Sequence, residues 1–532
     1  MKLILALAAL CTAPQLYPQL RHEPPCDGGT RHALPQTGSA PPCVVDKETA
    51  DNPWSGYGHD AQHTAVSAHA AQALKSIHWQ TPVDFSPPGG GSGDIFIHYG
   101  SPVVTAANTV IVPVKTGATD GFELEAFKGA NGSLLYTLPS NYTLPIHAWT
   151  PAYGPVLSRG SRLFYAGAGG TVLYRDLPDS ATGPSGRIAF YGTALYNANQ
   201  SAFNNSVQIS TPLTADRSGN IFFGFTVTGQ NPANLQSGIA RINFSGEGVW
   251  VSAVSLSGDG TANNILTNCA PAVSNDEKTI YVATSNGSEY ATGYLTSLNA
   301  TTLAPVAHTS LFDPRGSLAT LSTDSSAAPM VGPDGDVYYG VLESPCCTSH
   351  NDRGWLLHFD STLTQLRTPG SFGWDDTASV VPSSAVPGYT GTSAYLILTK
   401  YNNYADIGTG TGINKVGILD PFATMADEYS SSSVTVMKEV ITVTGVTADP
   451  STSLPGAVHE WCINTAAIDP QTRAAIINSE DGVVYRWDFT SNTLLQRLRL
   501  TAGRGEAYTP TVIGSDGTVY AINDAILFAI GN

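Results

Sequence analysis

Charged residues are scarce in this chain, and most of those present are acidic. They make up 13% of the 532 residues, with 25 Lys and Arg against 42 Asp and Glu, for a formal net charge of −17. No basic run occurs, so the long-range field would repel phosphate backbones and anionic membranes. We therefore expect neither a nucleic-acid partner nor a membrane partner.

Long apolar runs are missing as well. Nothing in the sequence approaches the ~18 consecutive apolar residues of a transmembrane helix. The start, "MKLILALAALCTAPQ", has one Lys, an apolar run from Leu3 to Leu10 and then small residues, which is the layout of a secretory signal. We expect a signal peptide over residues 1–13 and a secreted, extracellular protein.

Cysteine is also rare. Cys11 lies in the expected signal, and six cysteines remain, namely Cys26, Cys43, Cys269, Cys346, Cys347 and Cys462. An even number on an oxidising export route allows all six to be paired. Asn-X-Ser/Thr sequons begin at Asn131, Asn141, Asn199, Asn204, Asn243, Asn286 and Asn299. In an exported eukaryotic chain these would be surface glycosylation sites, whereas in a bacterial chain they would carry no such meaning.

Glycine and β-branched residues are plentiful, and they recur in one pattern. A small or polar residue precedes an apolar stretch, a Gly/Asp/Asn turn and a second β-branched or aromatic run. Eight copies begin at Ser101, Tyr153, Ser210, Ala270, Ala327, Ser379, Asn464 and Tyr508. A third and usually a fourth apolar run follow each copy. The pattern predicts an all-β fold, an eight-bladed β-propeller of four-stranded antiparallel blades.

The two ends of the repeat region indicate how the ring closes. The last copy ends at "ILFAIGN" with three strands, and "SIHWQTPV" at 76–83 precedes the first copy. Pairing this N-terminal strand into the last blade would remove the open sheet edges. We expect one propeller domain over residues 51–532, preceded by a Pro-rich arm at 14–50 that a Cys26–Cys43 disulfide would clip. We expect the protein to be a monomer.

The segment "WSGYGHDAQHTAVS" at 54–67, followed by these blades, resembles the pyrroloquinoline quinone (PQQ)-like propeller superfamily. That superfamily includes quinoprotein alcohol dehydrogenases and many members without quinone. The resemblance covers nearly the whole chain and implies the fold, with structural roles for His59 and His63. The tryptophan-docking repeat of the dehydrogenases is degraded here, because "VVYRWDFTSNTLLQ" and "LHFDSTLTQ" keep only an Asp, a Ser or Thr and an aromatic residue.

Cys346 and Cys347 are adjacent in "ESPCCTSHNDRGW". Neighbouring Cα atoms lie about 3.8 Å apart across a trans peptide, below the usual ~4.4–6.8 Å of a disulfide, so a bond between them would lock a tight turn. The alternative is that each pairs elsewhere. The dehydrogenases that this chain resembles place a vicinal disulfide over the quinone, but early in the chain and not in the fifth blade. Their Glu, Asn and Asp set for calcium is not recognisable, so the motifs do not support PQQ with calcium as a cofactor.

Strand order places candidate residues on one rim of the propeller. The innermost strand of a blade starts on the rim to which the loop between its second and third strands returns, and propellers usually bind ligands there. Candidate catalytic residues on this rim are His350, Arg353, His459 and Arg504. Candidate ligand-binding residues are Cys346, Cys347, Trp149, Trp374, Asp376, Lys400 and Glu506. The rim also receives His98, Tyr99, His147, Asn268, Asp324, Asp352, Asp375, Tyr401, Asn402, Glu460, Trp461 and Tyr508. A structural role in capping strand ends is the alternative for each.

Several catalytic motifs are absent from the sequence. No His-X-His, His-Glu-X-X-His or Cys-X-X-Cys spacing supports a zinc site, and neither a phosphate-binding Gly loop nor a Gly-X-Ser-X-Gly elbow occurs. Cys269 and Cys462 begin the innermost strands of the fourth and seventh blades. They would pair with each other if Cys346 pairs with Cys347 and Cys26 with Cys43, although six cysteines allow fifteen pairings.

Two functions remain from this sequence. The first is binding of a small molecule or glycan at the channel mouth. The second is an enzyme that uses the same rim, either a quinone-dependent oxidoreductase or a lyase acting on acidic sugars. A lyase needs a base beside a cation, which His350 with Arg353, or His459 with Arg504, would supply. A purely structural module would instead expose a broad apolar rim.

Overall fold

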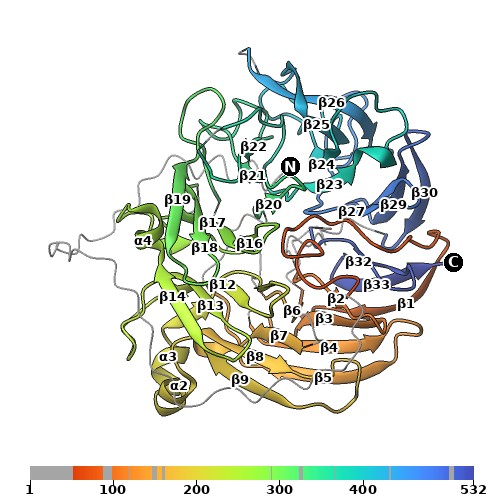
Figure 1. Cartoon of the computed structure of the whole chain (residues 1–532). Helices are drawn as coiled ribbons and strands as arrows, with labels where there is room; N and C mark the ends of the chain where they lie inside the picture. Colours follow the sequence, from red (N-terminus) through yellow and green to blue (C-terminus); the bar gives the residue numbers. More distant parts are fainter. Residues whose placement is uncertain are drawn as a thin grey trace.

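Eight antiparallel sheets follow one another along the described part of the chain and surround a central axis (Figure 1). The structure, a computed structural model, describes residues 52–87, 99–118, 120–145, 153–158, 162–288, 290–322, 327–364, 366–430, 433–502 and 508–532. Each sheet is one blade, so the eight-bladed β-propeller predicted from the repeat is confirmed.

In the first four blades, the strands that come first in the sequence lie nearest the axis. Blade 1 has β2 (Val103–Val104), β3 (Thr109–Lys115), β4 (Phe122–Lys128) and β5 (Leu134–Ser140), and blade 2 has β6 (Val156–Ser158), β7 (Arg162–Ala166), β8 (Thr171–Arg175) and β9 (Ser185–Ala189). Blade 3 has β10 (Val207–Ile209), β11 (Thr214–Ala215), β12 (Ile221–Val227), β13 (Gly238–Ile242) and β14 (Gly248–Ser252). Blade 4 has β15 (Asn264–Ile265), β16 (Ala272–Val273), β17 (Thr279–Ser285), β18 (Gly293–Asn299) and β19 (Pro305–Ser310).

The remaining blades complete the circle. Blade 5 has β20 (Met330–Val331), β21 (Val337–Val341) and β22 (Trp355–Phe359), and blade 6 has β23 (Ser379–Pro382), β24 (Tyr395–Tyr401), β25 (Lys415–Ala426) and β26 (Thr435–Thr444). Blade 7 has β27 (Ala467–Asp469), β28 (Ala474–Asn478), β29 (Val483–Asp488) and β30 (Thr493–Arg499), and blade 8 has β31 (Val512–Ile513), β32 (Val519–Asn523), β33 (Ile526–Gly531) and β1 (Ser76–Pro82).

The helices of the described residues are short. Between blades lie α2 (Thr193–Ala198), α3 (Gln200–Asn204) and α4 (Ala253–Ser257), whereas η1 (Ala168–Gly170) lies within blade 2 and η2 (Ser383–Ala385) within blade 6. Within the described residues, no helix has both the length and the apolar character needed to cross a bilayer.

Burial along each strand follows its position in the blade. Central strands such as β3, β21 and β28 are buried at every residue, because neighbouring blades cover both of their faces. The outermost strands β1 and β30 instead alternate between exposed and half-buried residues. Buried apolar clusters therefore lie between blades, as in the one that joins blades 1, 2 and 3.

Blade 5 departs from the expected four strands. After β22 the chain makes only isolated bridges, Phe359 with Leu366 and Leu356 with Gly370. Pro369 lies in this run, and proline cannot donate to a ladder. The long hairpin β25–β26 of blade 6 covers part of the gap, since Met437 N–H donates to Pro369 O at 2.8 Å.

The N-terminal strand closes the ring as predicted. β1 pairs antiparallel with β33, from Ser76 opposite Gly531 to Pro82 opposite Ile526. Trp79 of β1 packs against Tyr520 of blade 8 and Phe127 of blade 1, with ring centroids 5.9 and 5.6 Å away. This strand therefore joins the last blade to the first.

Residues 54–72, here called the floor segment, run around the other end of the channel and lie near the centre of Figure 1 in red and orange. Its backbone bonds or pairs with blades 1, 2, 4, 5, 6, 7 and 8 in that order, through Trp54–Val104, Ser55–Leu157, Ala61–Val273, Gln62–Val331, Thr64–Val380, Ala65–Ile468 and Gln72–Gly517. Val331 ends β20 on the side away from the loop after β21. The floor segment thus lies opposite the rim that carries the candidate residues.

Side chains of the floor segment fill this end of the channel. His63 is 1% exposed, and its Nδ1 lies 2.7 Å from the Pro329 carbonyl oxygen. Tyr57 packs edge-on against His63, with ring centroids 5.2 Å apart. Burial lowers the pKa of His63 to about 4, so the imidazole is neutral at neutral pH.

Candidate functional site

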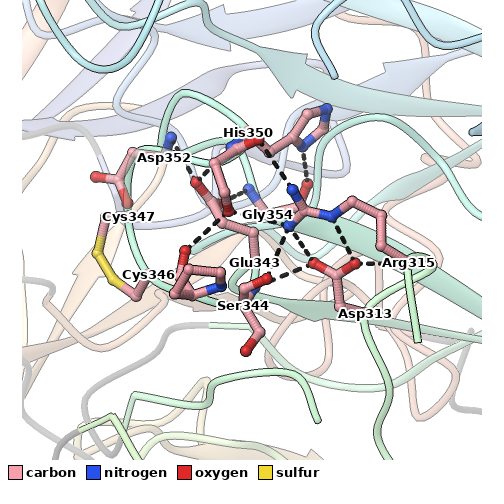
Figure 2. The surroundings of a disulfide bond; sticks show 11 residues. Asp313, Arg315, Glu343, Ser344, Cys346, Cys347, His350, Asp352 and Gly354 are labelled. Carbon is pink, nitrogen blue, oxygen red and sulfur yellow. Dashed lines mark hydrogen bonds and ion pairs between the residues drawn. A yellow bond between two sulfur atoms is a disulfide. The ribbon is translucent and has the colours of Figure 1, made fainter. Parts of the chain in front are cut away.

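Cys346 and Cys347 form a vicinal disulfide in the loop between β21 and β22 (Figure 2). Both the bond and the loop agree with the sequence prediction. The two residues are joined by a cis peptide bond. Residues 343–354, here called the knuckle loop, carry the disulfide on the rim opposite the floor segment.

Glu343 organises the knuckle loop from within. Its carboxylate accepts the backbone N–H groups of His350 at 3.1 Å, Asp352 at 2.9 Å and Gly354 at 2.8 Å. Burial raises the pKa of Glu343, while the N–H bonds from the loop favour its charged form. One buried carboxylate therefore fixes the course of the whole loop.

Blade 4 holds the same loop from outside. Asp313 follows β19, and its carboxylate accepts Ser344 N–H at 3.0 Å and Trp355 Nε1–H at 2.9 Å. Arg315 pairs with Asp313 at 2.6 Å and donates to the Ser344 carbonyl at 3.1 Å (Figure 2). These contacts anchor the start of the loop beside the disulfide.

His350 is fully buried within the protein. Its ring stacks on Trp355 with centroids 3.7 Å apart, Nδ1 lies 2.9 Å from Gly354 O, and Nε2 lies 3.1 Å from the Asp427 carboxylate. Both ring nitrogens thus have protein partners. His350 attaches the knuckle loop to the β25–β26 hairpin and positions that loop.

Arg353 is likewise buried and links blade 5 to blade 6. Its guanidinium donates to the carbonyls of Ser371, at 2.8 Å, and Asn402, and lies 3.6 Å from the ring centroid of Tyr429. The Asn402 side chain in turn accepts the N–H of Trp461 at 3.1 Å. The structure therefore gives His350 and Arg353 separate structural contacts and does not join them as a base and a cation.

Asp352 differs from its neighbours in the loop. The residue is 7% exposed, and Figure 2 shows its carboxylate on the disulfide side, away from Glu343. One ligand atom from each of Asp352, Cys346 and Cys347 lies within 4.8 Å of the others. Burial raises the pKa of Asp352 well above its ordinary value, and the charges of Glu343 and Glu460 add to this effect.

Asp375, Asp376 and Lys400, here called the mouth cluster, lie between blades 5 and 7. Lys400 is the last residue but one of β24, is 1% exposed, and has its Nζ 3.6 Å from Asp375 Oδ2. Asp376 accepts the Thr399 hydroxyl and the Lys400 N–H at 3.2 Å. Burial raises the pKa of Asp376 to about 7, against the opposing charge of Lys400.

Aromatic residues surround the mouth cluster. The Lys400 Nζ lies 5.0 Å from the ring centroid of Tyr508. From the floor segment, Tyr57 reaches up the channel, and its hydroxyl lies 2.8 Å from Thr377 Oγ1 and 2.5 Å from Asn464 Oδ1. Burial raises the pKa of Tyr57 far above its ordinary value, and the nearby charge of Asp375 adds to this.

The loop before β27 brings a second group of ionisable residues to the rim. His459 Nδ1 lies 3.0 Å from Glu480 Oε1, and the Cys462 thiol lies 3.2 Å from Glu480 Oε2. One ligand atom from each of Glu460, Cys462 and Glu480 lies within 4.8 Å of the others. His459 therefore faces a carboxylate, whereas its expected partner Arg504 is outside the described residues.

The expected Cys269–Cys462 disulfide is wrong, because neither cysteine is disulfide-bonded. Cys269 is fully buried, and its thiol lies 4.0 Å from the Tyr339 hydroxyl, while Cys462 contacts Glu480. Burial raises the pKa of Cys269 to about 12. An even number of cysteines does not predict the pairing here. Cys269 and Cys462 share a rim, but this does not bring blade 4 within bonding distance of blade 7.

Other predicted residues fall in two classes. Trp374 is half-buried, and its N–H donates to the Arg353 carbonyl at 3.1 Å, which places it beside the knuckle loop. The residues that lie outside the described part of the chain are Trp149, Arg504 and Glu506, together with His98, His147, Asp324 and the Cys26–Cys43 pair.

Sequence reasoning missed Glu343, Asp313 and Glu480. Glu480 lies between β28 and β29, so the strand-order rule that located Lys400 also places it on this rim. The surrounding "NSEDG" has the composition of a solvated turn, so the sequence gives no sign that the Glu480 carboxylate contacts other rim residues. Nothing in the sequence marks Glu343 or Asp313, because Glu343 accepts backbone N–H groups and Asp313 accepts donors that belong to the next blade.

Comparison with known proteins identifies the fold. No protein-family model matches the chain, and no curated protein matches it either. Among solved structures, a europium-containing methanol dehydrogenase matches with a TM-score of 0.52 and 10% identity over 88% of this chain and 89% of its own. The quinohemoprotein alcohol dehydrogenase from Comamonas testosteroni matches with a TM-score of 0.51 and 11% identity over 91% of this chain and 82% of its own. The chain therefore shares the β-propeller fold of these two dehydrogenases.

The residues beside the disulfide do not fit a quinone held with calcium. Glu343 already accepts three backbone N–H groups. The Asn351 side-chain oxygen accepts Thr409 N–H at 2.9 Å, and its amide donates to Asn403 at 3.0 Å. Among the described residues, Asp352 alone contributes a carboxylate within 4.8 Å of both sulfurs. Calcium takes six to eight oxygen ligands, which this surrounding does not provide.

Proposed function

We propose that this protein binds a small polar molecule, with glycans as the favoured class, at the channel mouth. The buried mouth cluster carries the proposal, because ionisable groups gathered in a propeller channel are costly to bury and mark a site that a ligand completes. Lys400 has its ammonium 3.6 Å from Asp375, while Asp376 is held by backbone and hydroxyl donors. The site lies above the floor segment, at the end of the channel where propellers bind ligands.

The chemistry of the lining favours glycans over other polar molecules. Carboxylates accept hydrogen bonds from sugar hydroxyls, and aromatic side chains such as Tyr508 and Trp374 present apolar faces with polar edges. The net charge of −17 opposes polymers of phosphate groups. Nucleotides and phosphorylated polymers are disfavoured for the same reason.

Thermal unfolding of the full-length protein against a panel of neutral and uronic-acid oligosaccharides tests this proposal. We expect at least one sugar to raise the Tm of the wild type. Lys400→Met should lose that increase because it removes the buried cation. Lys278→Met is the matched control, since the Lys278 side chain is 78% exposed on blade 4. If no sugar raises the Tm, the glycan class is wrong, and an equal rise in Lys400→Met would show that the site lies elsewhere.

A lyase acting on acidic sugars is the second candidate function. The observation that favours it is the pairing of Asp376, whose pKa burial raises to about 7, with the adjacent Lys400. A base poised near neutral pH beside a cation that neutralises the substrate carboxylate is the arrangement that proton abstraction requires. Base removal of the proton next to the carboxyl group and loss of the glycosidic oxygen would leave a conjugated double bond. Ultraviolet absorbance from that bond after incubation with polyuronates tests this candidate.

We further propose that the protein is exported through its apolar N-terminal segment. The proposal is supported by the run from Leu3 to Leu10 in the sequence. N-terminal sequencing of protein recovered from the culture medium tests it. A mature chain that retains Met1 would contradict cleavage of a signal peptide.

A further inference from the structure

Glu460, Cys462 and Glu480, here called the three-ligand group, come together from two loops of blade 7. Cys462 Sγ lies 3.2 Å from Glu480 Oε2 and 4.0 Å from Glu460 Oε2. Glu460 and Cys462 precede β27, whereas Glu480 lies between β28 and β29. Two carboxylates and a thiol within this distance form a mixed oxygen and sulfur donor set.

The spacing suits a tetrahedral divalent ion. Zinc bonds thiolate sulfur at about 2.3 Å and carboxylate oxygen at about 2.1 Å, so tetrahedral ligands of these two kinds lie about 3.6 Å apart. The two sulfur-to-oxygen distances of 3.2 and 4.0 Å lie on either side of that value. A thiolate among the donors favours zinc over calcium or magnesium.

Neighbouring groups fix the orientation of Glu480. Its Oε1 lies 3.0 Å from His459 Nδ1 and accepts the Glu460 N–H at 3.0 Å. Oε2 is thereby left facing Cys462. Outer contacts of this kind hold a metal-ligating carboxylate in position.

Asp352 of blade 5, whose carboxylate lies on the disulfide side of the knuckle loop, adds negative charge that acts on this group. Asp352 is 7% exposed, and among the described residues no hydrogen-bond donor reaches its carboxylate. Its charge interacts with that of Glu460. Lys400 opposes part of this negative charge, and several carboxylates buried near one another favour a bound cation.

We propose that Glu460, Cys462 and Glu480 bind Zn²⁺ and leave a fourth coordination position for water or a ligand oxygen. Three protein ligands with one open position are typical of zinc sites that exchange or activate a ligand. The ion offsets the charges of the two glutamates, the thiolate and the nearby Asp352. The site is distinct from the mouth cluster, and metal binding does not depend on the sugar ligand proposed above.

Cobalt substitution in the tag-free, full-length protein tests the site. After chelator treatment and dialysis, Co²⁺ should bind in one equivalent and give a near-ultraviolet thiolate-to-cobalt absorption band, which Zn²⁺ then displaces. Cys462→Ser should abolish the band. Cys269→Ser is the matched control, because Cys269 on blade 4 is the other buried thiol among the residues that the structure describes, and it should leave the band unchanged. His459→Ala should weaken Zn²⁺ binding about 10- to 100-fold by freeing Glu480.

Each alternative result overturns the assignment. Absence of the band in the wild type excludes thiolate ligation, and this measurement needs no variant. A band that persists in Cys462→Ser, or that disappears in Cys269→Ser, places the metal at another thiol. Circular dichroism checks that each variant is folded, and Glu480→Gln provides a second ligand substitution if Cys462→Ser does not fold.

Discussion

Replacing Asp376 with Asn should make the stability of the protein less dependent on pH. Burial raises the pKa of Asp376 from its ordinary value of 3.8 to about 7 in the folded state. The folded protein therefore holds this proton more tightly than the unfolded chain does. The resulting stabilisation is fully present below about pH 4 and is lost as the pH rises through about 7. A difference of about 3 in pKa corresponds to about 4 kcal/mol.

The Asn side chain keeps an oxygen that can accept from Thr399 and from the Lys400 N–H, but it does not titrate. We expect the unfolding free energy of the wild type minus that of Asp376→Asn to fall by up to about 4 kcal/mol between pH 4 and pH 8. Urea unfolding followed by tryptophan fluorescence across this range measures the difference. Glu428→Gln, which replaces an exposed carboxyl in the β25–β26 turn, is the matched control. A difference for Asp376→Asn that does not change with pH would refute the burial argument.

Two further substitutions test the supports of the fold. Glu343→Gln leaves one oxygen for three backbone N–H groups, so it should cost about 1–3 kcal/mol and speed amide exchange in the knuckle loop. Unchanged exchange by mass spectrometry would contradict that role. Lys115→Met leaves the buried Asp84, 3.2 Å away, without its cation and should cost about 3–5 kcal/mol in urea unfolding. Adding Asp84→Asn should recover part of the loss, and no recovery would count against the ion pair.

The ring of blades could be predicted because each blade repeats the same sequence pattern. Apolar central strands, polar turns and regular spacing recur eight times, so a single unit carries the information for the whole fold. Closure by β1 followed from counting strands, since the last copy lacks its fourth strand. The sequence did not indicate that blade 5 would end at its third strand, β22. The lack of a fourth strand depends on Pro369 and on the long β25–β26 hairpin of blade 6.

The candidate site was only partly predictable. Strand order placed Lys400, Asp376, Cys346 and Cys347 on one rim, but it does not state which side chains turn inward. Histidine is a residue type that often acts as a catalytic base, but His350 is stacked on a tryptophan inside the protein. A contact between a side chain and a distant backbone group leaves no trace in a single sequence.

Carboxylates that hold loops are hardest to foresee for this reason. Glu343 accepts hydrogen bonds from three amides of its own loop, and Asp313 accepts one from the loop of the next blade. Neither belongs to a motif or a regular spacing. Their roles arise only after the blades have packed side by side.

The floor segment has a consequence for the order of folding. Its residues are synthesised before every blade, yet its partners extend from Val104 to Gly517. Contacts across such sequence separations form late, because the intervening chain must first be arranged. The contacts of the segment with blades 7 and 8 can therefore form only after those blades are in place, and β1 follows the segment directly into blade 8. Sealing the base of the channel and closing the ring are thus completed together, so a chain that lacks residues 54–82 should have neither a sealed base nor a closed ring.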